Sequence, residues 1–137
     1  MADDFKILDS TVDDLLRRSE ALAALIIDKS GALIRQRGAV GNFDTTTIAA
    51  LAAGSFGAGQ ALAERLGETN FSNIHQQGEH HSLLICNIDA NALLVIIFQA
   101  EISVGAVKQY ASAAVKQAAV QLQKVRQRSA RGTPSAA

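Results

Sequence analysis

The apolar positions of this chain follow two periods, one typical of helices and the other typical of strands. Apolar residues at helical spacing predict three helices, over residues 10–19, 43–66 and 103–128. Short apolar runs between turn residues predict five strands, over residues 21–28, 32–37, 69–77, 80–88 and 92–99. The order is αββαβββα, and the hairpin turns between neighbouring strands predict an antiparallel sheet. Together these elements predict an α/β fold of the α+β sandwich type.

Turn and cap residues define where the central elements begin and end. Asp28 and Gly31 occupy the first and last positions of a type I turn, and Gly31 can adopt a positive φ. The long second helix can be capped by Asp44 or by one of the threonines at 45–47, and Gly67 can end it.

The second helix has no polar face. Between Ile48 and Ala63 its only polar side chains are Ser55 and Gln60, and a helix that is apolar all round is buried all round. We predict that one stripe packs on the sheet: Ile48, Leu51, Ser55, Gly59, Leu62 and Leu66. The opposite stripe would then be covered by a second copy of the chain, and it consists of Ala50, Ala53, Gly54, Gly57 and Ala61. The alternative is an ordinary buried helix that its glycines merely weaken, at about 1 kcal/mol each.

The composition and net charge of the chain limit the kinds of protein it can be. The chain has 137 residues, of which 48% are apolar and 19% charged, which predicts one domain with a substantial core over residues 1–128. The net charge is zero, which argues against general binding of nucleic acid. Residues 129–137 carry the only proline and are predicted to be a disordered tail.

Cysteine use and the apolar runs point to a cytoplasmic protein. Cys86 is the only cysteine, so the chain forms no internal disulfide, which fits a reducing compartment. The first ten residues lack the apolar core of a signal peptide. No apolar run approaches the ~18 residues that span a bilayer, so we expect no membrane span.

Three segments resemble the Roadblock family, which includes dynein light chains of the roadblock type and bacterial MglB-type regulators. They are IIDKSGALI at 26–34, TIAALAAGSFGAGQALAERLG at 47–67 and SLLICNIDANALLVIIF at 82–98. The resemblance covers roughly residues 10–122 and lies in the element order and the first hairpin. It implies a five-stranded antiparallel sheet, a helix layer, and a homodimer in which the second helices pair and polar edge strands meet.

The apolar second helix and the polar segment 69–77 are the features that such a dimer needs. A polar strand of this kind belongs at a sheet edge. The predicted dimer interface comprises Ala49, Ala50, Ala53, Gly54, Gly57, Ala61, Phe71, Asn73 and His75.

The resemblance also implies a partner, because bacterial members of the family bind Ras-like small GTPases on the surface of the paired helices. Phe56, Gln60 and Glu64 lie on one flank of the second helix and are predicted to contact that partner, with Phe56 as the aromatic anchor. Phe56 as a core residue is the alternative. The predicted function is regulation of the GTP/GDP cycle, with stimulation of hydrolysis as one form. A structural adaptor without effect on nucleotide turnover, and a small-molecule sensor with a pocket under the sheet, are the competing classes.

No catalytic site, cofactor or metal site is predicted, so the chain is not expected to be an enzyme. His80 and His81 are adjacent in a strand and would point to opposite faces, and with His75 they give only a weak zinc pattern. Cys86 lies in an apolar strand as a small buried residue. We interpret Asp13 and Asp14 as a solvated first helical turn. The basic residues at the C-terminus, Lys124, Arg126, Arg128 and Arg131, form a solvated helix end or contact an acidic partner.

Overall fold

The computed structural model describes residues 5–132 and contains three helices and five strands. In chain order these are α1 (Lys6–Ser19), β1 (Ala23–Asp28), β2 (Leu33–Gly38), α2 (Thr45–Arg65), β3 (Asn73–Gln76), β4 (His81–Asn87), β5 (Ala92–Gln99) and α3 (Val104–Gly132). The predicted order of elements is confirmed.

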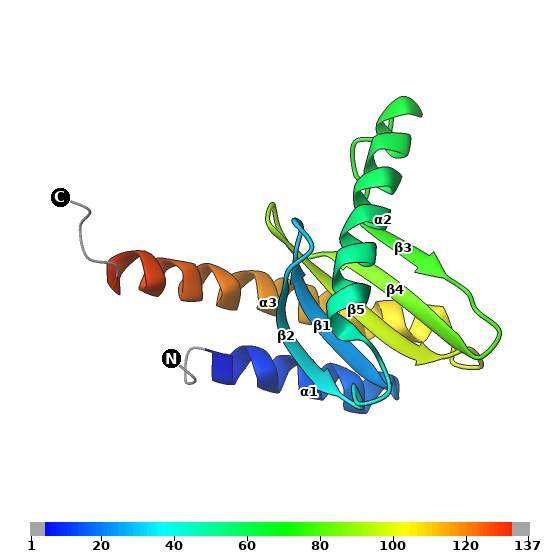
Figure 1. The fold of residues 1–137 in the computed structure, drawn as a ribbon, viewed down its shortest axis with the longest axis horizontal. Helices are drawn as coiled ribbons and strands as arrows, with labels where there is room; N and C mark the ends of the chain where they lie inside the picture. Colours follow the sequence, from blue (N-terminus) through cyan, green and yellow to red (C-terminus); the bar gives the residue numbers. More distant parts are fainter. Residues whose placement is uncertain (1–4, 133–137) are drawn as a thin grey trace.

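The five strands form one sheet in the order β2-β1-β5-β4-β3, and all neighbouring strands are antiparallel. The two most apolar segments, β1 and β5, lie at or next to its centre, and almost every one of their residues is buried. Figure 1 shows α2 on one face of the sheet and α1 and α3 on the other. Each face has its own apolar core, so the predicted sandwich of sheet and helices is confirmed.

The ends of the first hairpin and of α2 follow from their turn and cap residues. Gly31 has φ +103° in the turn between β1 and β2, and its N–H donates to the carbonyl of Asp28 over 2.8 Å. The carboxylate of Asp44 accepts the N–H of Thr47 over 3.2 Å at the start of α2. At the other end the N–H groups of Gly67 and Glu68 donate back to the last helical turn, which closes α2 as a Schellman motif.

The largest corrections to the predicted boundaries concern β3, α1 and α3. Strand β3 covers only Asn73–Gln76 of the predicted segment 69–77. Helix α1 begins at Lys6 rather than at residue 10, because Leu8 continues the buried stripe of Val12 and Leu15 by one more turn. Helix α3 continues to Gly132 rather than ending at residue 128, so the segment predicted as a disordered tail is helical over 129–132. The rest of that tail, 133–137, lies outside the described residues.

The orientation of α2 on the sheet also differs from the prediction. The buried residues of α2 are Ala49, Ala52, Phe56 and Ala63, whereas Leu51, Leu62 and Leu66 are 68%, 63% and 72% exposed. Small side chains let the helix approach the sheet closely, as at Gly59, where a Cβ would lie 2.8 Å from the ring of Phe71. The leucines therefore point away from the sheet.

Asp89 joins the turn between β4 and β5 to α3. One carboxylate oxygen accepts the N–H groups of Asn91 and Ala92 over 2.8 and 2.9 Å, and the other accepts Arg126 over 2.7 Å. Burial raises the pKa of Asp89, but the hydrogen bonds from Arg126 and the two amides outweigh burial, so this pKa lies below its ordinary value.

Asp89→Asn should lower the free energy of unfolding at pH 7 by about 1–3 kcal/mol, because Arg126 loses its charged partner. The folded pKa of Asp89 is depressed, so the carboxylate stabilises the fold above the ordinary aspartate pKa and this contribution is lost as the pH falls through the folded value. Urea unfolding at pH 7 and at acidic pH measures both effects.

Asp14→Asn is the matched control, because Asp14 pairs with Arg17 and Arg18 at an exposed position and should contribute about 0.5 kcal/mol or less. Equal losses in the two variants, or a loss in Asp89→Asn that does not shrink at acidic pH, would contradict the role given to Asp89.

Candidate functional site

The outward side of α2 is an exposed apolar surface. We call this surface the outer face. It is formed by Ala50, Leu51, Gly54, Ser55, Gly57, Ala58, Ala61 and Leu62, all of which are exposed. A Cβ added at Gly54 or Gly57 would meet nothing within 4 Å, so neither glycine is required by packing inside this chain. Figure 1 shows the C-terminal turns of α2 extending beyond the sheet, which adds to this exposure. A continuous apolar helix face of this kind is typical of a protein–protein interface.

The three residues predicted to bind a partner do not all lie at the surface. Gln60 and Glu64 are exposed. Phe56 is only 2% exposed, and its ring lies 4.9 Å from that of Phe71 and below Lys29 Nζ at 5.6 Å. The prediction that Phe56 is a surface anchor is therefore corrected: its side chain belongs to the core between α2 and the sheet.

The residues of α2 predicted at a dimer interface lie in three different environments. Gly54, Gly57 and Ala61 lie on the outer face, as does Ala50. Ala49 is fully buried against the sheet, so its placement in an interface is wrong. Ala53 is half-buried beside Gly31 of the first hairpin. The helical pattern placed Ala50, Gly54, Gly57 and Ala61 away from the sheet, where the structure also has them, but it wrongly placed the leucine stripe against the sheet.

The polar strand β3 lies at a sheet edge, as its sequence predicts. Phe71, Asn73 and His75 are each half-buried. Phe71 packs under α2, whereas the His75 ring stacks on Phe98 on the opposite side of the sheet at a centroid distance of 6.1 Å. The side chains of these residues therefore divide between both faces, and what β3 offers along its open edge is backbone N–H and C=O groups.

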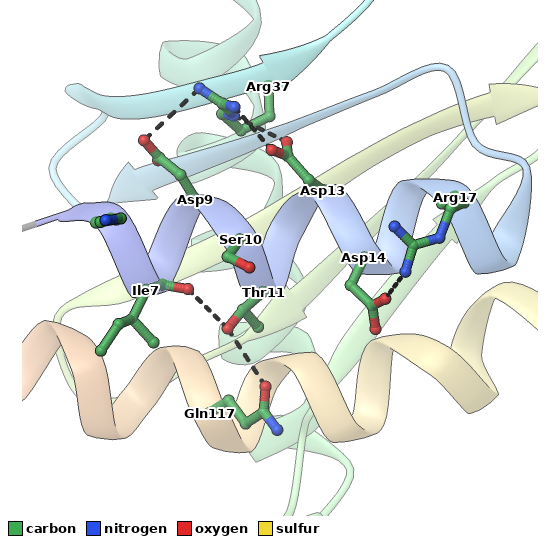
Figure 2. A pocket seen from close by; sticks show the side chains of 10 residues that line it. Ile7, Asp9, Ser10, Thr11, Asp13, Asp14, Arg17, Arg37 and Gln117 are labelled. Atoms are coloured by element: carbon green, nitrogen blue, oxygen red, sulfur yellow. Dashed lines mark hydrogen bonds and ion pairs between the residues drawn. The ribbon is translucent and has the colours of Figure 1, made fainter.

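A hydrogen-bonded network between α1 and β2 was not predicted. Figure 2 shows Arg37 of β2 reaching Asp13 and Asp9 of α1, with Arg37–Asp13 hydrogen bonds of 2.9 and 2.7 Å and an Arg37–Asp9 distance of 3.6 Å. Arg35 also pairs with Asp9. The interpretation of Asp13 is thus corrected: it is an ion-paired residue in the middle of α1 rather than a solvated residue of the first turn.

The network holds α1 onto the edge of the sheet. The hydrogen bond from Arg37 lowers the pKa of Asp13 despite partial burial. On the other side of α1, the Thr11 hydroxyl donates to the Ile7 carbonyl and lies 3.3 Å from the Gln117 side chain of α3 (Figure 2). A depression beside α1 is lined in part by these same side chains. Because these polar groups already bond to one another, we interpret the depression as structural rather than as a reactive site.

The thiol and imidazole groups offer no reactive centre within the described residues. Burial raises the pKa of Cys86 to about 12, although the charge of Lys108 acts in the opposite direction, so the thiol is protonated at neutral pH. The His81 and Phe43 rings are nearly perpendicular, with their centroids 5.6 Å apart. Across residues 5–132 no group of three or more His, Cys, Asp or Glu side chains is placed to hold a metal ion. Over the same residues, no helix is long and apolar enough to cross a membrane.

Comparison with known families matches residues 7–98 to the Roadblock/LC7 domain. The chain belongs to the Roadblock/LC7 family. The match spans α1 through β5 and so includes the outer face of α2 and the edge strand β3. The resemblance seen in the sequence is confirmed, and so is the fold that it implied.

Solved structures of MglB are similar to this Roadblock/LC7 chain over most of its length. An MglB with a tetrameric arrangement shares 29% identity, covers 88% of this chain and 91% of its own, and has a TM-score of 0.82. MglB from Myxococcus xanthus shares 32% identity over 90% of this chain and 97% of its own, with a TM-score of 0.76. The gliding protein MglB from Thermus thermophilus shares 30% identity over 88% and 92%, with a TM-score of 0.81. No curated protein matches the sequence.

Proposed function

We propose that this chain is a cytoplasmic, homodimeric regulator that binds a Ras-like small GTPase and modulates its GTP/GDP cycle. The observation that carries the proposal is the exposed apolar outer face of α2 on a chain similar to MglB. Roadblock/LC7 domains are in general regulatory or adaptor modules rather than catalysts.

Two copies would bury the outer face by packing α2 against α2. The exposed leucines at 51 and 62 supply apolar area, and the glycines at 54 and 57 leave room for close approach of the backbones. In the same dimer, β3 would extend the sheet by pairing with β3 of the second copy, which would satisfy its open edge.

The paired helices would form the platform for the GTPase. Between Thr45 and Glu64 the platform helix carries no arginine, so it offers none in its middle to act as an arginine finger. If this chain stimulates hydrolysis, it does so by ordering the switch loops of the GTPase itself.

The proposal is tested by measuring GTP hydrolysis and nucleotide release of the cognate Ras-like GTPase with and without this protein. A change in either rate that saturates with protein concentration supports regulation. Tight binding with unchanged rates would favour the alternative of a structural adaptor, and no binding to either nucleotide state would reject the proposal.

Gln60 and Glu64 remain the proposed partner contacts, because both are exposed beside the outer face. The double variant Gln60→Ala/Glu64→Ala should weaken GTPase binding about tenfold by loss of polar contacts, while the dimer is retained. Calorimetric titration with the GTP-loaded GTPase measures the affinity, and sedimentation measures the dimer.

The matched control is Glu101→Ala/Gln123→Ala, which removes the same two side-chain types from exposed positions outside α2. If the control weakens binding as much as the α2 variant, the GTPase does not bind where we place it.

A further inference from the structure

A second concave site lies between α3 and the β3–β4 side of the sheet, on the opposite side of the sheet from α2. Its cavity measures about 210 Å³. It is lined by Ser72, Asn73, Cys86, Asn87, Lys108, Ala111, Ser112, Val115 and Lys116. All of these residues come from one chain, and the cavity lies on the face of the sheet opposite the outer face of α2. Its strand side includes Asn73 of β3, so the cavity borders the edge that would pair in the proposed dimer.

The cavity has an apolar floor and a polar rim. Cys86 and Ala111 are 7% and 2% exposed and form the floor together with Val115. Lys108, Ser112 and Lys116 are exposed and follow one another at intervals of four residues along α3. Residues at that spacing lie on one side of a helix, so the two ammonium groups and the hydroxyl between them border the same opening.

The charges around this cavity are unbalanced. Among the residues that the structure describes, no Asp or Glu lines it. Within residues 5–132, Lys108 and Lys116 form no ion pair. On the strand side, the Asn73 amide donates to the Ser72 hydroxyl oxygen over 3.3 Å, which leaves the Ser72 hydroxyl hydrogen able to donate. Asn87 adds a buried amide oxygen that has no hydrogen-bond partner, but no carboxylate offsets the two lysine charges, and this excess of positive charge favours an anion as the ligand.

We propose that this cavity binds the phosphate group of a small phosphorylated molecule. Two lysines without an arginine act as point charges, which suits the distributed acceptor oxygens of a phosphate better than the planar, bidentate geometry of a carboxylate. The cavity volume is many times the roughly 10–15 Å³ that one water needs, so the cavity admits a phosphate with a short organic group. The apolar floor would contact that organic group.

The site can be tested on the full chain by NMR titration at constant ionic strength. The probes are inorganic phosphate, glycerol 3-phosphate, a phosphoserine peptide and acetate. We expect saturable binding of phosphate and glycerol 3-phosphate, with the shifts confined to residues 72–73, 86–87 and 108–116. Acetate should bind at least about fivefold more weakly than phosphate. If the phosphoserine peptide binds more tightly than glycerol 3-phosphate, the ligand is a phosphorylated protein segment and not a small molecule. If acetate binds as tightly as phosphate, the site is not specific for phosphate and the proposal is wrong.

The double variant Lys108→Gln/Lys116→Gln should weaken phosphate binding at least about tenfold while keeping the fold, as checked by circular dichroism. Lys124→Gln is the control, because Lys124 is an exposed lysine of the same helix outside the cavity. No saturable binding to the wild-type chain, or an equal loss in the control, would reject the site, since the effect would then reflect charge in general.

Discussion

Gly54→Glu is expected to convert the proposed dimer into a folded monomer. Gly54 lies on the outer face of α2, where an added side chain meets nothing within 4 Å in the single chain. Replacing a glycine inside a helix with Glu also raises helix propensity by about 0.5 kcal/mol, so the isolated fold should be at least as stable as before. In the proposed helix pair, however, the carboxylate would be buried without a partner.

An unpaired charge buried at an interface costs about 3–5 kcal/mol, which corresponds to a weakening of association by more than about 100-fold. Sedimentation of wild type and variant across the micromolar range measures this change directly. Leu62→Glu introduces the same charge at a second exposed position of the outer face and should act in the same way.

The control for charge alone is Gln123→Glu, which adds one negative charge at an exposed position of α3. It should leave the dimer unchanged. A monomeric wild-type protein, or variants at positions 54 and 62 that remain dimeric, would show that α2 does not pair and would remove the basis of the GTPase platform.

The element order could be predicted because its signals are local. The apolar runs of β1 and β5 are continuous, and the ends of α2 are fixed by Asp44 and Gly67, each within a few residues of the group that it caps. The polar composition of β3 was sufficient to place it at an edge. These features depend on neighbours in the sequence, so periodicity and turn chemistry identify them.

The rotation of α2 could not be predicted from the same pattern. A helix with one polar face has only one way to lie on a sheet, but α2 is apolar on every side. The stripe containing Leu51 and Leu62 has larger side chains than the stripe containing Ala49 and Ala52, and size alone favoured the leucines for the core. The structure instead buries the alanines with Phe56, which leaves the leucines available to a partner.

The network between α1 and β2 was missed for a different reason. Asp9 and Asp13 are one helical turn apart, and Arg35 and Arg37 are two strand positions apart, so each pair projects on one side of its element. Both spacings can be found in the sequence. That the two aspartates pair with the two arginines follows only once α1 lies against β2, and this tertiary contact is not contained in local patterns.

Phe56→Ala is expected to destabilise the folded chain by about 3–5 kcal/mol, the usual cost of truncating a buried phenylalanine. The ring is 2% exposed and packs between α2 and the sheet against Phe71. Because the whole stability of a domain is about 5–15 kcal/mol, this loss would lower the urea midpoint strongly. Circular dichroism during urea unfolding measures it.

The comparison is cleanest in the monomeric Gly54→Glu background, where changes in association do not contribute to the unfolding curve. Leu51→Ala is the matched truncation, because Leu51 belongs to the same helix but is 68% exposed. It should cost the monomer well under about 1 kcal/mol, since little buried area is lost. If Phe56→Ala instead left the urea midpoint unchanged and abolished GTPase binding, Phe56 would be the surface anchor that the sequence first indicated, and the core described between α2 and the sheet would be wrong at its largest side chain.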